Sequence, residues 1–224
     1  MFFKPRKLLV LATYLAILAT AGCASISQTV TQLIADPVQT NVLSGREGEN
    51  GPVLVVKIDD TRYARPQVGL EFADVVYIEQ VEGGLTRLAA VFSSIIPTRI
   101  GPVRSARISD VELFAQYGRV AFAYSGAQKK LLPVIAGANL SDVGAMRRGP
   151  MFYETDLNRI QPFAMFLNAQ TLMANEATKG TVIDSARNVG WNFSKELENE
   201  GFEISDVTMH WPAQKYSATW NEAL

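Results

Sequence analysis

A nearly continuous apolar run at residues 53–58 begins directly after Gly51-Pro52 and is rich in β-branched side chains. Such residues favour the pleated conformation of a strand. A strand in which polar and apolar residues do not alternate is typical of a sheet interior, where both faces are covered. The sequence therefore predicts a central strand here, with a packing layer on each side of its sheet.

The following segments predict an antiparallel hairpin and several helices. Strands are expected at 74–79 and 85–92, and the glycines of Glu82-Gly83-Gly84 suit the turn between them. Ser109 and Glu112 have capping-box spacing and predict a helix near 110–117. Further helices are expected near Lys129 to Leu131, from Pro162 to about Ala177 and at 194–199. Further strands are expected at 120–124, 202–211 and 216–220. This order predicts a single α/β to α+β domain with a mixed β-sheet, at least one antiparallel hairpin and flanking helices.

The N-terminus has the parts of a secretory signal, with basic residues up to Lys7, an apolar stretch at 8–18 and small residues before Cys23. Between Lys7 and Cys23 lie 15 residues. As a helix they would span about 22 Å at about 1.5 Å per residue. A bilayer core is about 30 Å thick, so a permanent transmembrane helix is not predicted.

Ala21-Gly22-Cys23 resembles the lipobox of bacterial lipoproteins, although Thr20 stands where Leu is commonest. A lipobox implies cleavage after Gly22 and a diacylglyceryl lipid, with palmitate-like acyl chains, on Cys23. Two acyl chains anchor a protein stably, because each buried CH₂ contributes about 0.8 kcal/mol. The expected location is therefore the extracytoplasmic face of the cell membrane. An ordinary cleaved signal with an incidental cysteine is the alternative.

This interpretation divides the chain into a signal peptide at 1–22, a lipid-anchored flexible tether at 23–44 and a folded domain at 45–224. Ser, Thr, Gln and Asn dominate the tether, which has too little apolar surface to fold alone. Without the signal, 18 basic side chains face 22 acidic ones, a balance that does not favour nucleic-acid binding. Cys23 is the only cysteine and His210 the only histidine, so no metal site and no cofactor is predicted.

Three loop segments carry the polar residues that could perform chemistry: 59–67, 79–87 and 99–107. Arginine is preferred to lysine there, and its planar fork meets carboxylates or phosphates through two bonds. Residues 57–112 hold seven basic and eight acidic side chains, so an internal ion-pair network is the structural alternative to an anion site. The two interpretations are compatible.

Our leading hypothesis is a non-catalytic binding module whose ligand is anionic: a wall polymer, a peptide carboxylate or a protein partner. The proposed ligand-binding residues are Arg65, Glu82, Arg87, Arg104 and Arg107. The alternative is an envelope hydrolase or transferase that uses the carboxylates of Asp59, Glu79 and Glu82 as acid and base.

Five motifs follow one another along the chain: Asn41-Val42-Leu43-Ser44-Gly45, Ala64-Arg65-Pro66-Gln67-Val68-Gly69-Leu70, Ala73-Asp74-Val75-Val76-Tyr77, Glu82-Gly83-Gly84-Leu85-Thr86-Arg87 and Gly101-Pro102-Val103-Arg104-Ser105-Ala106-Arg107. Together they resemble the YerB-like family of bacterial lipoproteins. The family has no known function, so the resemblance implies a lipoprotein class and no reaction.

One departure from the family pattern lies at Phe163 and Ala164, where the resemblance leads us to expect His and Asn. If those polar residues serve a site, this chain lacks part of it. Similar proteins also continue beyond the region that corresponds to Leu224, so the chain is expected to be a fragment or a shortened member.

Overall fold

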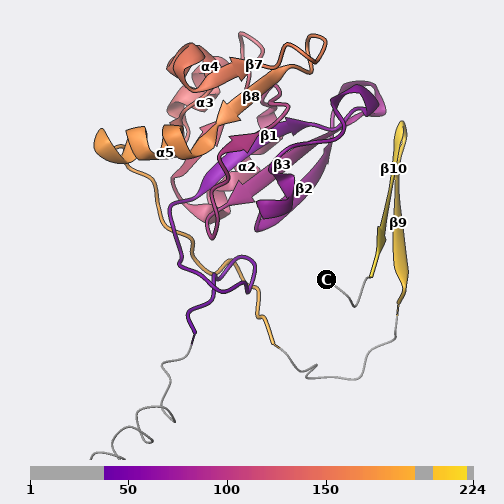
Figure 1. Cartoon of the computed structure of the whole chain (residues 1–224), viewed down its shortest axis with the longest axis horizontal. Helices are drawn as coiled ribbons and strands as arrows, with labels where there is room; N and C mark the ends of the chain where they lie inside the picture. Colours follow the sequence, from indigo (N-terminus) through magenta and orange to yellow (C-terminus); the bar gives the residue numbers. More distant parts are fainter. Residues whose placement is uncertain (1–37, 195–203, 221–224) are drawn as a thin grey trace, which may run out of the picture. The chain divides into compact units, whose positions relative to one another are not determined.

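The computed structural model describes residues 38–194 and 204–220 (Figure 1). The proposed lipidation site Cys23, the predicted signal peptide and nearly all of the expected helix at 194–199 lie outside the described residues. Residues Gln39–Leu224 form one compact unit. Within the described ranges no helix is both long and apolar enough to cross a membrane.

The main sheet has five strands in the order β2-β3-β1-β5-β6. Their bounds are β1 Leu54–Asp59, β2 Val75–Gln80, β3 Thr86–Phe92, β5 Val120–Ala123 and β6 Leu140–Asp142. β3 pairs antiparallel with both β1 and β2, whereas β1, β5 and β6 pair in parallel. The predicted mixed sheet, its central first strand and its antiparallel hairpin are confirmed.

Strand β1 separates two apolar cores, because successive side chains of a strand point to opposite faces. Leu54, Val56 and Ile58 belong to one core, and Val53 and Val55 belong to the other. All are buried, as expected for a strand covered on both sides.

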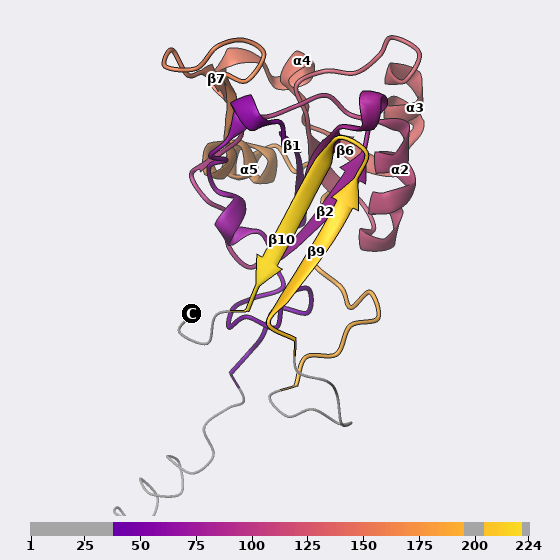
Figure 2. The same ribbon diagram turned by 90° about the vertical axis from the view of Figure 1, so that its right-hand side faces the viewer.

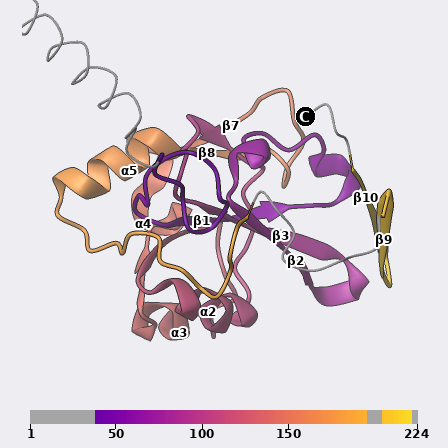
Figure 3. The ribbon, with the colours of Figure 1, turned by 90° about the horizontal axis from the view of Figure 1, so that it is seen from below.

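Helices α2 (Ile108–Phe114) and α3 (Leu132–Gly137) cover the face of the sheet that Val53 and Val55 share. Helix α5 (Ala169–Thr178) and a second sheet, β4-β8-β7, cover the other face (Figure 3). The second sheet comprises β4 Arg99–Ile100, β7 Tyr153–Thr155 and β8 Met165–Asn168, and the short helix α4 spans Ala145–Arg148.

Three predicted helices are corrected. Helix α2 begins at Ile108, because Asp110, not Glu112, accepts the capping hydrogen bond from the Arg107 amide at 2.6 Å. Lys129 precedes α3, which begins at Leu132. The expected helix from Pro162 to Ala177 is strand β8 followed by α5, so its first half was wrong.

Residues 39–44, which the sequence assigns to the tether, belong to the compact unit. Asn41 and Leu43 are buried, and the Asn41 amide donates hydrogen bonds to the Glu49 carbonyl and the Ser93 hydroxyl. The satisfied amide and the buried leucine explain why this polar segment is ordered.

The last two strands, β9 (Asp206–Trp211) and β10 (Gln214–Thr219), form an antiparallel hairpin (Figure 2). His210 is exposed on β9. The hairpin contacts the loops of the main sheet through polar groups: the Ala213 amide donates to the Gly84 carbonyl at 3.1 Å, and the Gln214 side chain donates to the Asp60 carbonyl at 3.1 Å.

Candidate functional site

Three of the predicted site residues lie in one row across the main sheet. Arg87 on β3 is directly opposite Glu79 on β2 and Asp59 on β1. Residues in register on neighbouring strands project from the same face. The row lies on the face of the sheet that α2 covers. Asp59, Lys57 and Val55 are every second residue of β1 and so share one face, and Val55 belongs to the core beneath α2.

Asp59 is fully buried and lies between two arginines. Its Oδ2 atom is 2.7 Å from Arg104 Nε and 3.6 Å from a terminal nitrogen of Arg87. Its Oδ1 atom accepts hydrogen bonds from the amide and hydroxyl of Thr61, at 2.8 and 2.7 Å. Because Oδ2 accepts no hydrogen bond among the described residues, the Asp59 carboxylate holds the two guanidinium groups at the end of β1 by charge attraction alone.

Arg87 is a buried cation that is only partly compensated. One terminal nitrogen donates to the Thr86 carbonyl at 2.8 Å, but among the described residues Nε has no hydrogen-bond partner. Burial lowers the pKa of Arg87; Asp59 opposes this shift, while Arg104 and Arg107 add to it. Arg87, Arg104 and Arg107 thus form an electrostatically coupled group, which we call the arginine cluster.

Arg107 is held by Glu82 in an exposed ion pair. Glu82 Oε2 accepts from Arg107 Nε at 3.0 Å and from a terminal nitrogen at 2.8 Å. The Glu82 side chain is 62% exposed, and its pKa is lowered by its own backbone amide and by Arg107. The pair lies at the surface edge of the cluster.

Arg65 pairs with a different carboxylate, Asp60, at 3.1 Å. Thr86 donates its hydroxyl to Asp60 Oδ2 at 2.7 Å, and Tyr216 of the C-terminal hairpin lies 2.7 Å from the same hydroxyl. Burial raises the pKa of Asp60, and Thr86 and Arg65 counteract that shift. Arg65 therefore joins the neighbouring Asp60 network and not the Asp59 group.

A buried lysine completes the charged face and was missed in the sequence analysis. Lys57 Nζ lies 2.5 Å from Glu79 and 2.7 Å from Asp110, which caps α2. Burial raises the pKa of Asp110 to about 6; Lys57 opposes this shift, and Glu79 adds to it. The signal that could have revealed this triad is the single charge inside the apolar run 53–58.

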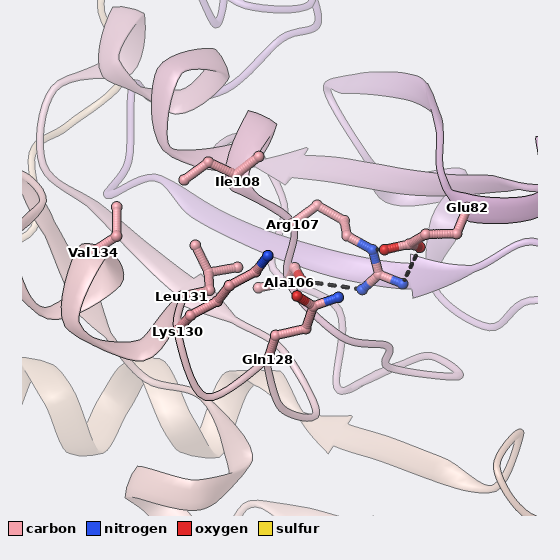
Figure 4. A pocket seen from close by; sticks show the side chains of 8 residues that line it. All are labelled: Glu82, Ala106, Arg107, Ile108, Gln128, Lys130, Leu131 and Val134. Carbon is pink, nitrogen blue, oxygen red and sulfur yellow. Dashed lines mark hydrogen bonds and ion pairs between the residues drawn. The ribbon is translucent and has the colours of Figure 1, made fainter.

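A pocket of about 480 Å³ adjoins the arginine cluster (Figure 4). Its polar lining consists of Glu82, Arg107, Gln128 and Lys130. Its apolar lining consists of Ala106, Ile108, Leu131 and Val134. Of these residues only Glu82 and Arg107 were predicted from the sequence, because the others are brought to the pocket by the packing of α2 and α3.

The proposed carboxylate acid–base set does not meet at this pocket. Asp59 is buried against arginines, Glu79 is paired with Lys57, and only Glu82 lines the pocket. Among the described residues, no group of His, Cys, Asp and Glu side chains is arranged to hold a metal ion.

Phe163 lies beside Arg104 of the arginine cluster. The Phe163 ring stacks on Tyr63, with centroids 5.8 Å apart, and lies 5.7 Å from the guanidinium carbon of Arg104. Ala164 is buried. The position where the family resemblance leads us to expect histidine thus faces Arg104 with an aromatic surface.

This chain is similar to one protein family and to a Bacillus protein whose crystal structure is also known. The family described as "Protein of unknown function (DUF3048) N-terminal domain" matches residues 39–182. "Putative lipoprotein YerB" of Bacillus subtilis (strain 168) is 36% identical over 114 residues, which cover 50% of this chain and 33% of that protein. The crystal structure of YerB protein from Bacillus subtilis has a TM-score of 0.58 at 24% identity and covers 66% of this chain and 52% of that one.

These matches confirm the resemblance predicted from the motifs between residues 41 and 107. The matched regions span about a third to a half of the relatives' length. The structural similarity supports the fold, and the relatives' names assign no ligand or reaction.

Proposed function

The chain belongs to the DUF3048 family of proteins of unknown function, and from that premise we propose that it is a membrane-anchored lipoprotein of the cell envelope that binds an anionic ligand. The arginine cluster is the proposed binding site. Binding, not catalysis, is favoured because the candidate carboxylates are already engaged with cations.

One observation carries the proposal: three coupled arginines share only two carboxylates, Asp59 and Glu82. These three arginines carry one positive charge more than the two carboxylates with which they pair. Arg104 and Arg107 are about a quarter exposed, with side-chain exposures of 24% and 23%, while Arg87 lies buried beneath the surface. Arg104 suits a carboxylate or phosphate ligand, because its terminal nitrogens have no hydrogen-bond partner among the described residues and a guanidinium can donate two parallel bonds to such groups.

The proposed anchor is a lipid on Cys23. Its support is the lipobox-like Ala21-Gly22-Cys23 and the lipoprotein name of a relative. Metabolic labelling with a palmitate analogue tests it. Incorporation should be lost in Cys23→Ser, and labelling that persists in this variant would contradict the anchor.

The binding proposal is tested by thermal melting of residues 39–224, the compact unit that contains both cores. Inorganic pyrophosphate and soluble cell-wall fragments are the probes, and a ligand that binds the folded state raises the melting temperature. Arg104→Gln and Arg107→Gln should each reduce that rise. Arg46→Gln is the matched control, because Arg46 is an exposed arginine that donates to the Phe72 carbonyl and does not belong to the arginine cluster.

Each variant's melting temperature without ligand is the reference, so that a loss of stability is not taken for a loss of binding. Ligand-induced shifts that are identical in the wild type, both cluster variants and the control would contradict the proposed site.

A further inference from the structure

The pocket beside the cluster has an apolar wall that a simple inorganic anion would leave unused. Ala106 and Leu131 are buried at its base, with exposures of 1% and 6%. Ile108 and Val134 line it while remaining 62% and 43% exposed. Its volume lies within the range of about 300–1,000 Å³ that small-molecule sites occupy. Exposed apolar side chains around a hollow are typical of a ligand or partner contact.

The opposite side of the pocket is polar and carries spare hydrogen-bond donors. Lys130 and Gln128 have no side-chain hydrogen bond or ion pair among residues 38–194 and 204–220, whereas Glu82 is already engaged by Arg107. In Figure 4 the polar ends of Lys130 and Gln128 extend toward Arg107, and Val134 lies away from it. Since the charges of Arg107 and Glu82 neutralise each other, Lys130 gives the polar side of the pocket a net charge of one positive unit.

We propose that this pocket binds an amphiphilic anion, with a phosphate or carboxylate head at Lys130, Gln128 and Arg107 and an alkyl chain against Ile108, Leu131 and Val134. The inference rests on the proposed anion-binding function and narrows its ligand class. A small inorganic anion would satisfy only the donors, and a neutral alkane or alcohol would bury only the wall. An amphiphilic anion matches both halves of the lining.

Isothermal titration of residues 39–224 with n-octyl phosphate tests the inference, with inorganic phosphate and n-octanol as the headgroup-only and chain-only probes. Octyl phosphate should bind at least tenfold more tightly than either, because the alkyl chain is removed from water while the head is hydrogen-bonded. Equal affinity for octyl phosphate and inorganic phosphate would overturn it.

Two variants test which side of the pocket binds the head and which contacts the alkyl chain. Lys130→Ala should weaken octyl phosphate binding at least fivefold and leave octanol unaffected. Val134→Ser should reduce the advantage of octyl phosphate over phosphate, and its exposed position limits any effect on folding. Lys129→Ala is the matched control, because Lys129 is an exposed neighbour that does not line the pocket. Equal losses in Lys129→Ala and Lys130→Ala would contradict the assignment.

The outcomes separate this inference from the function on which it rests. If phosphate binding depends on Arg104 but the octyl chain adds nothing, the anion site stands and the amphiphile inference fails. If no anionic probe binds, both fail. If a short apolar peptide carboxylate such as acetyl-Leu-Leu binds more tightly than octyl phosphate, the occupant is a peptide and the inference is overturned.

Discussion

Asp59 and Arg87 face each other across the β1–β3 pair, yet a gap of 3.6 Å separates Asp59 Oδ2 from the nearest Arg87 nitrogen. The closer partner of this oxygen is Arg104, at 2.7 Å, from the loop that follows β4. Asp59 therefore depends mainly on Arg104, and Arg87 remains a buried cation with a weakly held partner. We therefore expect Arg104 and Arg87 to contribute differently to the stability of the folded state.

Arg104→Met should destabilise the protein more than Arg87→Met. Loss of Arg104 removes the close partner of a buried carboxylate, which should cost about 3 kcal/mol of unfolding free energy. Arg87→Met should cost about 1 kcal/mol or less, because Asp59 keeps Arg104 and a poorly compensated buried cation is removed. Urea unfolding measures both. Equal costs, or a larger cost for Arg87→Met, would contradict the asymmetry.

Asp110→Asn should change how stability depends on pH. Burial raises the folded-state pKa of Asp110 from the ordinary value of 3.8 to about 6, so the folded state binds more protons than the unfolded state between these values. This carboxyl therefore stabilises the fold at low pH, and its contribution is lost as pH rises from about 4 to 6. The stability difference between wild type and Asp110→Asn should fall across that window.

Urea unfolding at pH 4, 5, 6 and 7 measures this effect. Glu112→Gln is the matched control, because Glu112 is an exposed carboxylate on the same helix. A difference between wild type and Asp110→Asn that stays constant, or rises with pH, would contradict the raised pKa.

Thr86→Val should destabilise the loop network at Asp60. The substitution keeps the shape of the side chain but removes the hydroxyl that donates to the buried Asp60 and contacts Tyr216. An unsatisfied buried acceptor costs about 1–3 kcal/mol. Thr208→Val is the control, because its hydroxyl pairs with Ser217 at an exposed position and should change stability by less than about 0.5 kcal/mol. Chemical unfolding in which the two variants behave alike would refute this role for Thr86.

Gly69→Ala should be more destabilising than Gly83→Ala, although both glycines have positive φ angles, +79° and +71°. A Cβ atom at Gly69 would lie 2.4 Å from the Arg99 carbonyl oxygen, whereas at Gly83 it would meet nothing within 4 Å. Gly83→Ala should therefore cost only the conformational penalty of about 1–2 kcal/mol. Melting temperatures of the two variants compare them directly, and similar values would argue against the close approach at Gly69.

The central strands could be predicted from local patterns, because apolar runs and the Glu82-Gly83-Gly84 turn specify β1, β2 and β3 without reference to the rest of the chain. The helix predicted after Pro162 was wrong in its first half because strand β8 is stabilised there by pairing with β7 and with the distant strand β4, and local sequence patterns do not reveal such pairing. The short strand β6 was missed for the same reason.

The kinds of residue in the candidate site could be predicted from the sequence, but the carboxylate that each arginine contacts could not. Loop arginines near carboxylates indicated an ion-paired or anion-binding region. Which carboxylate each arginine meets depends on strand register, which places Arg87 opposite Asp59, and on the loop that brings Arg104 to the same oxygen. Lys130 gave no signal, because its place in the pocket follows from the packing of α3 beside α2.

The most direct test of the arginine cluster as an anion site is a titration of residues 39–224 with pyrophosphate, followed by NMR of the arginine Nε–H groups. The Nε–H signals of Arg104 and Arg107 should shift together and saturate with a single dissociation constant. Those of Arg99 and Arg148, whose Nε atoms donate to Glu154 and Glu176, should stay unchanged in the same spectra. Shifts of equal size at all four arginines, or none at Arg104 and Arg107, would contradict the proposed site.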